Sequence, residues 1–232
     1  MGEVDQIKGI DSLKFLKTDF AEWKRVNSDQ QVDTKSMVTL FYNTEDPILS
    51  DKKVRQALNY ALPTKFEFGK KSYSPIIPTS PFYYPTSETQ PTGIELAKTI
   101  LESPGITVDQ DIVISTTSEY EKTAVSIQKA WTEIGIDSKI KIVNGIPTSF
   151  QVLLYKFKVP HDPDQYTLWH SRGGANITKY KSLRIDKLLE DGRSTLDNEK
   201  RITIYSDFQK YLLDDVPASF LYFPYTYTLT RK

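Results

Sequence analysis

The stretch DIVISTTSEYEKTAVSIQKAWTEIGIDSKIKIV, residues 111–143, decides the fold class. It opens on the short apolar run DIVIST, which is typical of a strand buried on both faces. Apolar residues then recur at alternating spacings of four and three, which predicts an amphipathic helix. The buried stripe of this helix consists of Tyr120, Ala124, Ile127, Trp131 and Ile134. KIKIV (139–143) alternates Lys with Ile and predicts a second strand, so the whole stretch is a βαβ unit of a partly parallel sheet.

Both ends of that helix carry sequence signals. Ser118 and Glu121 have the spacing of a capping box, in which two side chains satisfy the first free N–H groups of a helix. Gly135 suits the left-handed conformation that often ends a helix. A second capping box at Thr92 and Glu95 predicts a short helix that runs through Leu101.

Two further elements are expected before residue 64. MVTLFYN (37–43) is a β-branched and aromatic run that predicts a strand. Ser50 is the expected N-cap of a helix that Pro63 stops. The apolar face of this helix consists of Val54, Ala57, Leu58 and Ala61. Earlier in the chain, SLKFLK (12–17) and FAEWKRV (20–26) are interpreted as short strands.

The segments outside these elements are more varied. Residues 64–91 are rich in Pro, Ser, Thr and Tyr and predict a long irregular loop, of the kind that often carries function. A helix is predicted over IPTSFQVLLY (146–155). An irregular stretch over 158–182 follows it.

Two helices and a strand are expected to close the chain. RIDKLLED forms a helix that stops at Gly192, and a longer helix runs from Asp197 to about Leu213. The last strand, SFLYFPYTYTLT (219–230), is interrupted by Pro224, which suits an edge or a crossing segment. Together the elements predict an α/β domain with a mixed sheet and flanking helices.

Composition excludes several classes of function. The chain has 232 residues, 30 Lys and Arg against 30 Asp and Glu, and no cysteine. It therefore lacks the excess of basic residues that a nucleic-acid binder needs, and it cannot use thiol nucleophiles, Cys-ligated zinc or iron–sulfur clusters. No apolar run approaches the ~18 residues that cross a bilayer, and no signal-peptide pattern is present.

The sequence carries no strong catalytic motif. The phosphate-binding, nucleophile-elbow and HExxH patterns are absent. His161, Asp162, Asp164 and His170 could hold a divalent metal ion for hydrolysis. The alternative is that the DPD tripeptide forms a turn, because Asp side chains bond their own backbone and proline fixes φ.

The segment WHSRGGAN (169–176) mixes an aromatic platform with hydrogen-bonding groups. Sites for small or peptidic ligands use this mixture of apolar surface and a few polar groups. The alternative is that Trp169 belongs to the core and the rest is a turn. The residues alone leave both interpretations open.

Five colinear segments resemble one family, the extracellular solute-binding proteins of family 5, which are the oligopeptide-, dipeptide- and nickel-binding components of ABC transporters. The first is LFYNTEDPILSDKKVRQALNYAL (40–62), with Asn43 after a strand and Arg55 inside a helix. The others are IELAKTILESPG, IQKAWTEIGIDSKI, DPDQYTLWHS with IDKLLEDGR, and YSDFQKYLLDDVPASFLYFP. The resemblance covers about half of the usual family length.

This resemblance implies a fold and a function. Residues 37–232 are expected to be the C-terminal lobe of a two-lobed, periplasmic-binding-protein-like fold, preceded by a hinge or edge segment over 1–36. The lobe would bind a solute non-covalently, most simply an oligopeptide, in a cleft shared with a missing N-terminal lobe. An ABC-transporter permease is the expected partner, and the location is extracytoplasmic, in the periplasm or on the cell surface, with the signal sequence outside this chain. No enzymatic activity and no cofactor are expected.

The resemblance also points to candidate ligand contacts. Trp169, His170, Ser171 and Asn176 match the segment that lines the cleft in relatives, and the loop over 71–84 is similar in place to a cleft-edge loop. Peptide-binding relatives commonly place an Asp shortly before the DP turn, but residues 155–161 contain no acid. Asp162 and Asp164 are possible substitutes for that Asp, and the predicted ligand-binding set is completed by Tyr166. A metal-dependent hydrolase and a nickel or metal-chelate binder of the same family remain alternatives.

Overall fold

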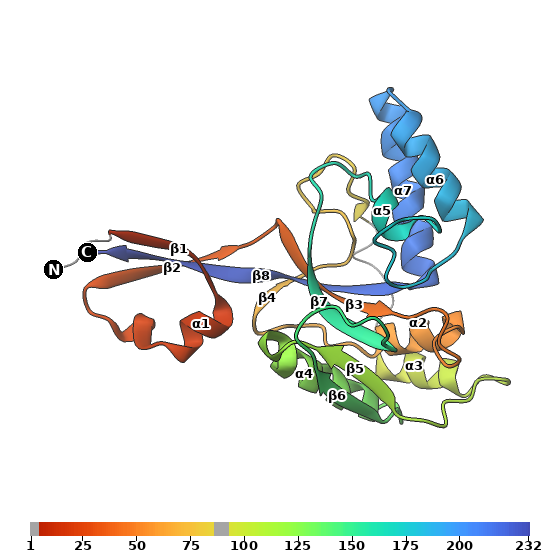
Figure 1. Ribbon diagram of the computed structural model, residues 1–232, viewed down its shortest axis with the longest axis horizontal. Coiled ribbons are helices and arrows are strands. Elements are labelled where there is room, and N and C mark those ends of the chain that lie inside the picture. Colours follow the sequence, from red (N-terminus) through yellow and green to blue (C-terminus); the bar gives the residue numbers. More distant parts are fainter. Residues whose placement is uncertain (1–4, 86–92) are drawn as a thin grey trace.

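The computed structural model describes residues 5–85 and 93–232, and within these ranges the centre of the molecule is a mixed sheet (Figure 1). Its strands follow the order β8-β3-β7-β5-β6. They are β3 (Ser36–Tyr42), β5 (Ile112–Thr116), β6 (Ser138–Ile142), β7 (Val152–Lys158) and the first part of β8 (Ala218–Arg231). β3 is antiparallel to β7 and β8, whereas β5 is parallel to both of its neighbours. The predicted mixed α/β sheet is confirmed.

Helices cover both faces of this sheet (Figure 1). The helices on one side are α2 (Lys52–Tyr60), α3 (Ile94–Leu101) and α4 (Glu121–Thr132). Those on the other side are α5 (Tyr166–Trp169), α6 (Leu183–Ser194) and α7 (Asn198–Asp215). None of the helices in the described residues is long and apolar enough to cross a membrane.

The sheet has a hydrophobic cluster on each face because side chains alternate along a strand. In β3, Val38, Leu40 and Tyr42 enter the cluster beneath α2, α3 and α4. Met37 and Phe41 of the same strand enter the opposite cluster, beneath α5, α6 and α7. A strand that is buried on both faces has a continuous apolar sequence, and this is why the sequence of residues 37–43 predicts a strand.

A second, smaller sheet extends from this body (Figure 1). It contains β1 (Gln6–Asp11), β2 (Val26–Val32) and the last part of β8, which pairs with both. The helix α1 (Ser12–Lys17) and a 3-10 turn (Asp19–Glu22) join β1 to β2. The ends of the described chain meet at the tip, where the Arg231 N–H donates to the Asp5 carbonyl at 2.9 Å. We call this part the extension.

β8 runs without interruption from the main sheet into the extension, contrary to the predicted break. Its Tyr222 pairs with Val38 of β3, and its Tyr225 pairs with Val32 of β2. Pro224 lies between these two pairings, and its carbonyl accepts a hydrogen bond from the Asp33 N–H at 2.9 Å. Proline is tolerated here because the strand changes partners at this residue. The predicted crossing segment is therefore confirmed.

Other predicted elements also need correction. Residues 12–17 form a helix and not a strand, because Asp11 accepts a hydrogen bond from the Lys14 N–H and caps it. Residues 20–26 contain the last three residues of the 3-10 turn and the first residue of β2. Residues 146–155 are not helical, since β7 begins at Val152 and pairs with β3 and β5. The loop over 64–91 includes the short strand β4 (Gly69–Lys71), which pairs with β8.

The helix ends differ from the sequence signals in detail. Asp51, not Ser50, caps α2 through the Lys53 N–H. Ser118 opens a 3-10 turn (Ser118–Tyr120) that precedes α4, with no side-chain capping bond, and Thr92 lies outside the described residues. Gly192 does not end α6 but lies inside it, where an added Cβ would be 2.8 Å from the Tyr205 ring.

The apolar stripe of α4 is confirmed in full. All five residues of the predicted stripe are buried: Tyr120, Ala124, Ile127, Trp131 and Ile134. Gly135 has φ +79°, the left-handed value that its place after the helix requires. The helix at 198–215 is confirmed as well, and Asp197 caps it by accepting hydrogen bonds from two backbone N–H groups.

The buried guanidinium of Arg55 connects α2 to the turn between α7 and β8. Its Nε donates to the Val216 carbonyl at 2.9 Å, its Nη2 to the Asp215 carbonyl at 2.6 Å, and its Nη1 to the Leu49 carbonyl at 2.7 Å. Val216 has φ +48°, a strained value for a β-branched residue. Burial lowers the pKa of Arg55, although nearby Asp215 opposes that effect. Arg55 therefore holds the backbone from which β8 starts.

We predict that Arg55→Lys lowers the free energy of unfolding by about 2–4 kcal/mol, because an ammonium group cannot reach all of these carbonyls and leaves some of them buried and unbonded. Urea denaturation followed by circular dichroism measures the change. The control Arg172→Lys, at an exposed position, is expected to change stability by less than about 0.5 kcal/mol. Equal effects of the two substitutions would contradict the role given to Arg55.

Candidate functional site

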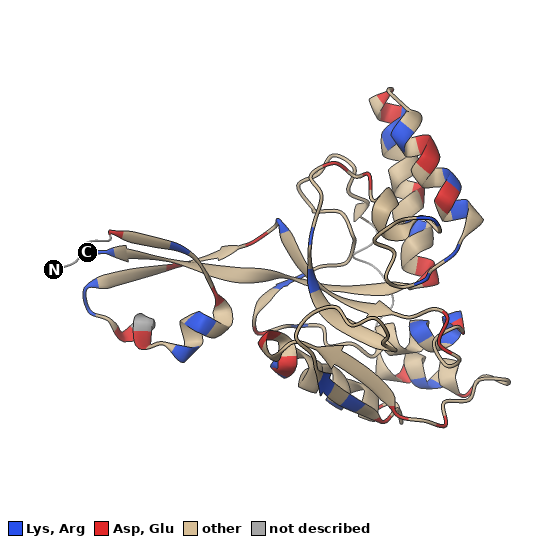
Figure 2. Ribbon diagram, in the orientation of Figure 1, with Lys and Arg blue, Asp and Glu red and all other residues tan. Residues whose placement is uncertain are grey.

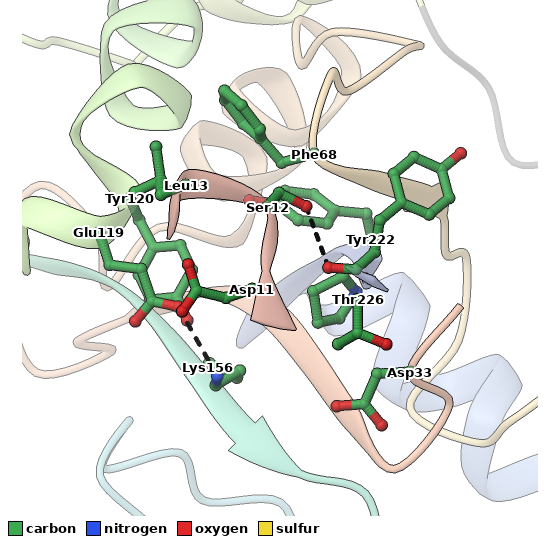
Figure 3. Close-up of a pocket in the computed structure, with 12 residues that line it drawn as sticks. Asp11, Ser12, Leu13, Asp33, Phe68, Glu119, Tyr120, Lys156, Tyr222 and Thr226 are labelled. Carbon is green, nitrogen blue, oxygen red and sulfur yellow. Dashed lines mark hydrogen bonds and ion pairs between the residues drawn. The ribbon is translucent and has the colours of Figure 1, made fainter. Parts of the chain in front are cut away.

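A crevice with a cavity volume of about 40 Å³ lies where the extension meets the main sheet (Figure 3). Its walls come from three places: the start of α1 in the extension, the 3-10 turn before α4 together with β7 in the body, and the crossing segment of β8. The lining residues are Asp11, Ser12, Leu13, Asp33, Phe68, Glu119, Tyr120, Lys156, Tyr222, Pro224, Tyr225 and Thr226. Segments more than 200 residues apart in sequence thus share one hollow.

Local structure fixes the polar side chains of the crevice. Asp11 ends β1 and caps α1, so its carboxylate lies at the junction. The Ser12 hydroxyl donates to the Tyr225 carbonyl at 3.0 Å and ties α1 to β8. Glu119 and Tyr120 follow the carboxyl end of β5, where the chain turns into α4. This is the end of a parallel strand at which α/β proteins usually bind ligands.

The crevice contains more carboxylates than ammonium groups. Asp11, Asp33 and Glu119 line it together with a single lysine, Lys156. The Lys156 ammonium lies 3.7 Å from the nearer Glu119 carboxylate oxygen, which is longer than a hydrogen bond. Both side chains are partly exposed, so this ion pair is weak, and another charged group can replace either partner.

Tyr120 is the buried polar residue of the crevice. It is 6% exposed, and its hydroxyl interacts with the Glu119 carboxylate but forms no hydrogen bond of normal geometry among the described residues. Burial raises the pKa of Tyr120, and the negative charges of Glu119 and Asp11 raise it further.

The predicted contact Trp169 is a core residue in this structure. It is 1% exposed, its indole Nε1 donates to the Gln165 side-chain oxygen at 2.7 Å, and its ring packs edge-on against Phe220. His170 is also buried. The Arg172 N–H donates to its Nδ1 at 3.0 Å, and its Nε2 lies 3.3 Å from a Glu190 carboxylate oxygen. Neither ring presents an open face to a ligand.

The remaining candidates hold the loop around α5 together. Asn176 donates from its side-chain amide to the carbonyls of His170 and Tyr180. The Ser171 N–H donates to Asp186 at 2.7 Å, and Tyr166 stacks on His170 with ring centroids 4.0 Å apart. Tyr166 and Ser171 are half-buried, so part of each side chain remains exposed.

The four residues of the predicted metal cluster are not gathered into one site. Asp162 accepts a hydrogen bond from Arg201 at 2.6 Å, and Asp164 pairs with Arg193 at 3.0 Å. Asp162 also accepts from the Asp164 N–H, so the turn interpretation of DPD is confirmed. Within residues 5–85 and 93–232, no group of three or more His, Asp or Glu side chains is placed to hold a metal ion.

None of the six predicted contact residues lines the crevice, and neither does the loop over 71–84. Buried Gln209 of α7 anchors that loop by accepting from the Ser74 hydroxyl and donating to the Phe82 carbonyl. Sequence reasoning missed Asp11, Glu119 and Lys156, because only the fold brings them together. One signal was available: residues just after a buried parallel strand, here 117–120, are favoured positions for a binding site.

Comparison with known proteins identifies the family. The family described as bacterial extracellular solute-binding proteins, family 5 Middle, matches residues 2–176. The chain belongs to this family. Its members include oligopeptide- and dipeptide-binding proteins of ABC transporters, which are extracellular or periplasmic.

Three relatives illustrate the match to family 5. The oligopeptide-binding protein AppA of Bacillus subtilis is 28% identical over 226 residues, which are 82% of this chain and 41% of AppA. The substrate-binding protein CtaP of Listeria monocytogenes superposes with a TM-score of 0.87 at 22% identity, over 99% of this chain and 51% of CtaP. DppA of Helicobacter pylori, solved with the peptide STSA, gives 0.85 at 24% identity, over 99% of this chain and 49% of DppA. The chain spans about half or less of the length of each of these proteins, as expected for one lobe.

We predict that the residues around the DPD turn bind no transition metal. Calorimetric titration with Zn²⁺ or Ni²⁺ is expected to show no saturable binding, because Asp162 and Asp164 are committed to arginines and both His170 nitrogens have partners. Saturable binding that disappears in the His161→Gln variant would contradict this prediction.

The ion pair between Asp162 and Arg201 predicts a pH dependence. The hydrogen bond from Arg201 lowers the pKa of Asp162 below its ordinary value of 3.8. The pair therefore stabilises the fold above this value and loses its effect as the pH falls below it. Asp162→Asn should lower the free energy of unfolding by less than about 1 kcal/mol near neutral pH, since the pair is partly exposed.

The measurement is thermal unfolding of both proteins from neutral to acidic pH. The difference between them should shrink to zero at acidic pH. The matched control Asp109→Asn, at an exposed loop position, is expected to show no such trend. A difference that stays constant with pH would mean that Asp162 acts through the turn and not through its charge.

Proposed function

We propose that this chain is the ligand-binding lobe of the solute-binding protein of an ABC importer, and that its ligand is an oligopeptide bound non-covalently in a cleft between two lobes. Membership of family 5 and the name of the AppA relative support the class of ligand. In this proposal the protein works outside the cytoplasm, delivers its ligand to a permease and catalyses no reaction.

The crevice at the β8 crossing is the observation that carries the proposal. It lies where two parts of the molecule are joined by few chain segments, and its walls belong to both parts. The described crossings are the link from β2 to β3 around Asp33 and β8 around Pro224. A bend at two such crossings closes a cleft over a ligand, which is the usual hinge motion of two-lobed binding proteins.

A second region enters the proposal through the loop around α5. Tyr166 and Ser171 keep exposed surface, and Asp162 is exposed, so these three remain proposed contacts for part of a long ligand. Trp169, His170 and Asn176 are proposed to act by holding that loop in place, since each has its polar atoms bonded inside the lobe.

The test is native mass spectrometry of the full-length protein, purified gently from cells. The expected result is a heterogeneous added mass that fragments into short peptides. Leu13→Trp, which fills the crevice, should remove most of this mass, because an indole cannot share a hollow of this size with a peptide.

Leu16→Trp is the matched control, since Leu16 lies on the same helix, is 54% exposed and does not line the crevice. It should leave the added mass unchanged. A discrete added mass that a chelator removes would contradict the peptide proposal. Equal loss of peptide in both tryptophan variants would contradict the placement of the ligand.

A further inference from the structure

The crevice has a distribution of charge that points to one class of ligand. Three carboxylates line it, from β1, from the β2–β3 link and from the turn before α4, against one ammonium group, that of Lys156. Figure 3 shows Asp11, Glu119 and Lys156 around Tyr120, with Asp33 farther along the hollow. Two more lysines, Lys14 and Lys17, line the neighbouring hollow, which shares Asp11 and Glu119 with the crevice. Acidic and basic residues are interspersed over the rest of the molecule (Figure 2).

The lysines near these carboxylates form only weak ion pairs with them. Lys156 lies 3.7 Å from Glu119, and Lys14 lies 3.4 Å from the second oxygen of Asp11 with 79% of its own side chain exposed. Lys17 lines the neighbouring hollow together with Lys14 and is exposed as well. Exposed pairs of this kind contribute little stability, so a ligand cation can replace them at small cost.

The hydroxyl of Tyr120 is an independent sign of a missing ligand atom. Buried polar atoms nearly always have a hydrogen-bond partner, and one without a partner needs a reason. This hydroxyl lies near the carboxylates of Glu119 and Asp11, and its contact with Glu119 does not reach the geometry of a normal hydrogen bond (Figure 3). An N–H group carrying positive charge would satisfy the hydroxyl oxygen and both carboxylates together.

We propose that the crevice binds a positively charged amine or guanidinium group of the ligand, paired with Asp11 and Glu119 and bonded to the Tyr120 hydroxyl. This inference rests on the proposed function and adds a ligand preference to it: peptides with a lysine or arginine side chain bind more tightly than uncharged peptides of the same length. Asp33, which is partly buried, also lines the hollow and adds negative charge.

The test compares two probe peptides, Ala-Lys-Ala and Ala-Met-Ala, by calorimetric titration of the full-length protein. They share both termini and have side chains of similar length, so their difference isolates the side-chain charge. We expect Ala-Lys-Ala to bind about tenfold more tightly at low salt. This preference should decrease as salt is added, because the charges are partly exposed.

Two variants assign the preference to named groups. The double variant Asp11→Asn, Glu119→Gln removes both charges while Asn keeps the cap of α1, and it should bind the two peptides within about twofold of each other. Tyr120→Phe should weaken Ala-Lys-Ala binding without lowering the melting temperature, because the hydroxyl forms no hydrogen bond of normal geometry inside the lobe. Glu121→Gln, two residues from Glu119 and exposed, is the matched control and should keep the full preference.

The outcomes separate this inference from the function on which it rests. Equal binding of both peptides by the unaltered protein would overturn the cation site and leave peptide binding standing. A preference that survives in the double variant would also overturn it, because the charge would then be recognised elsewhere. Binding of neither peptide would overturn both proposals. A preference lost in the double variant and kept in Glu121→Gln would support the site.

Discussion

The rest of the structure depends on β8, which is one continuous strand in two sheets. Its first part pairs with β3 and lies between the two hydrophobic clusters, and its last part holds β1 and β2 together. Because the strand exchanges partners at Pro224, the missing N–H of proline leaves no gap in either ladder. Arg55 fixes the turn from which the strand begins. The crevice exists only because this strand keeps the two parts at a set distance.

The position of the candidate site therefore follows directly from the fold. The residues of the crevice have no common motif, and each has a local structural reason to be where it is: Asp11 caps a helix, Glu119 follows a parallel strand, and Lys156 lies on β7. Their shared property is that they face the junction of two bodies. Family membership gives the class of protein, whereas the charge and the incompletely bonded hydroxyl of Tyr120 give the ligand chemistry that we propose.

Much of the fold could be predicted from the sequence where one side chain pattern had one structural meaning. The stripe from Tyr120 to Ile134 could only be a helix face, and residues 37–43 could only be a buried strand. The prediction was wrong for residues 146–155, because β7 is decided by its neighbours β3 and β5 and not by local preference. The site was harder. Trp169 was an equally good candidate for core and for ligand contact, and only its position beneath α6 and α7 separates the two.

The pairing of β1 and β2 with the last part of β8 has a mechanical consequence. β8 is bonded to both strands along their length, and the Arg231 N–H donates to the Asp5 carbonyl at the tip. The extension is therefore expected to move as one stiff unit. A force applied to it would reach the main sheet through the β2–β3 link at Asp33 and through β8 at Pro224.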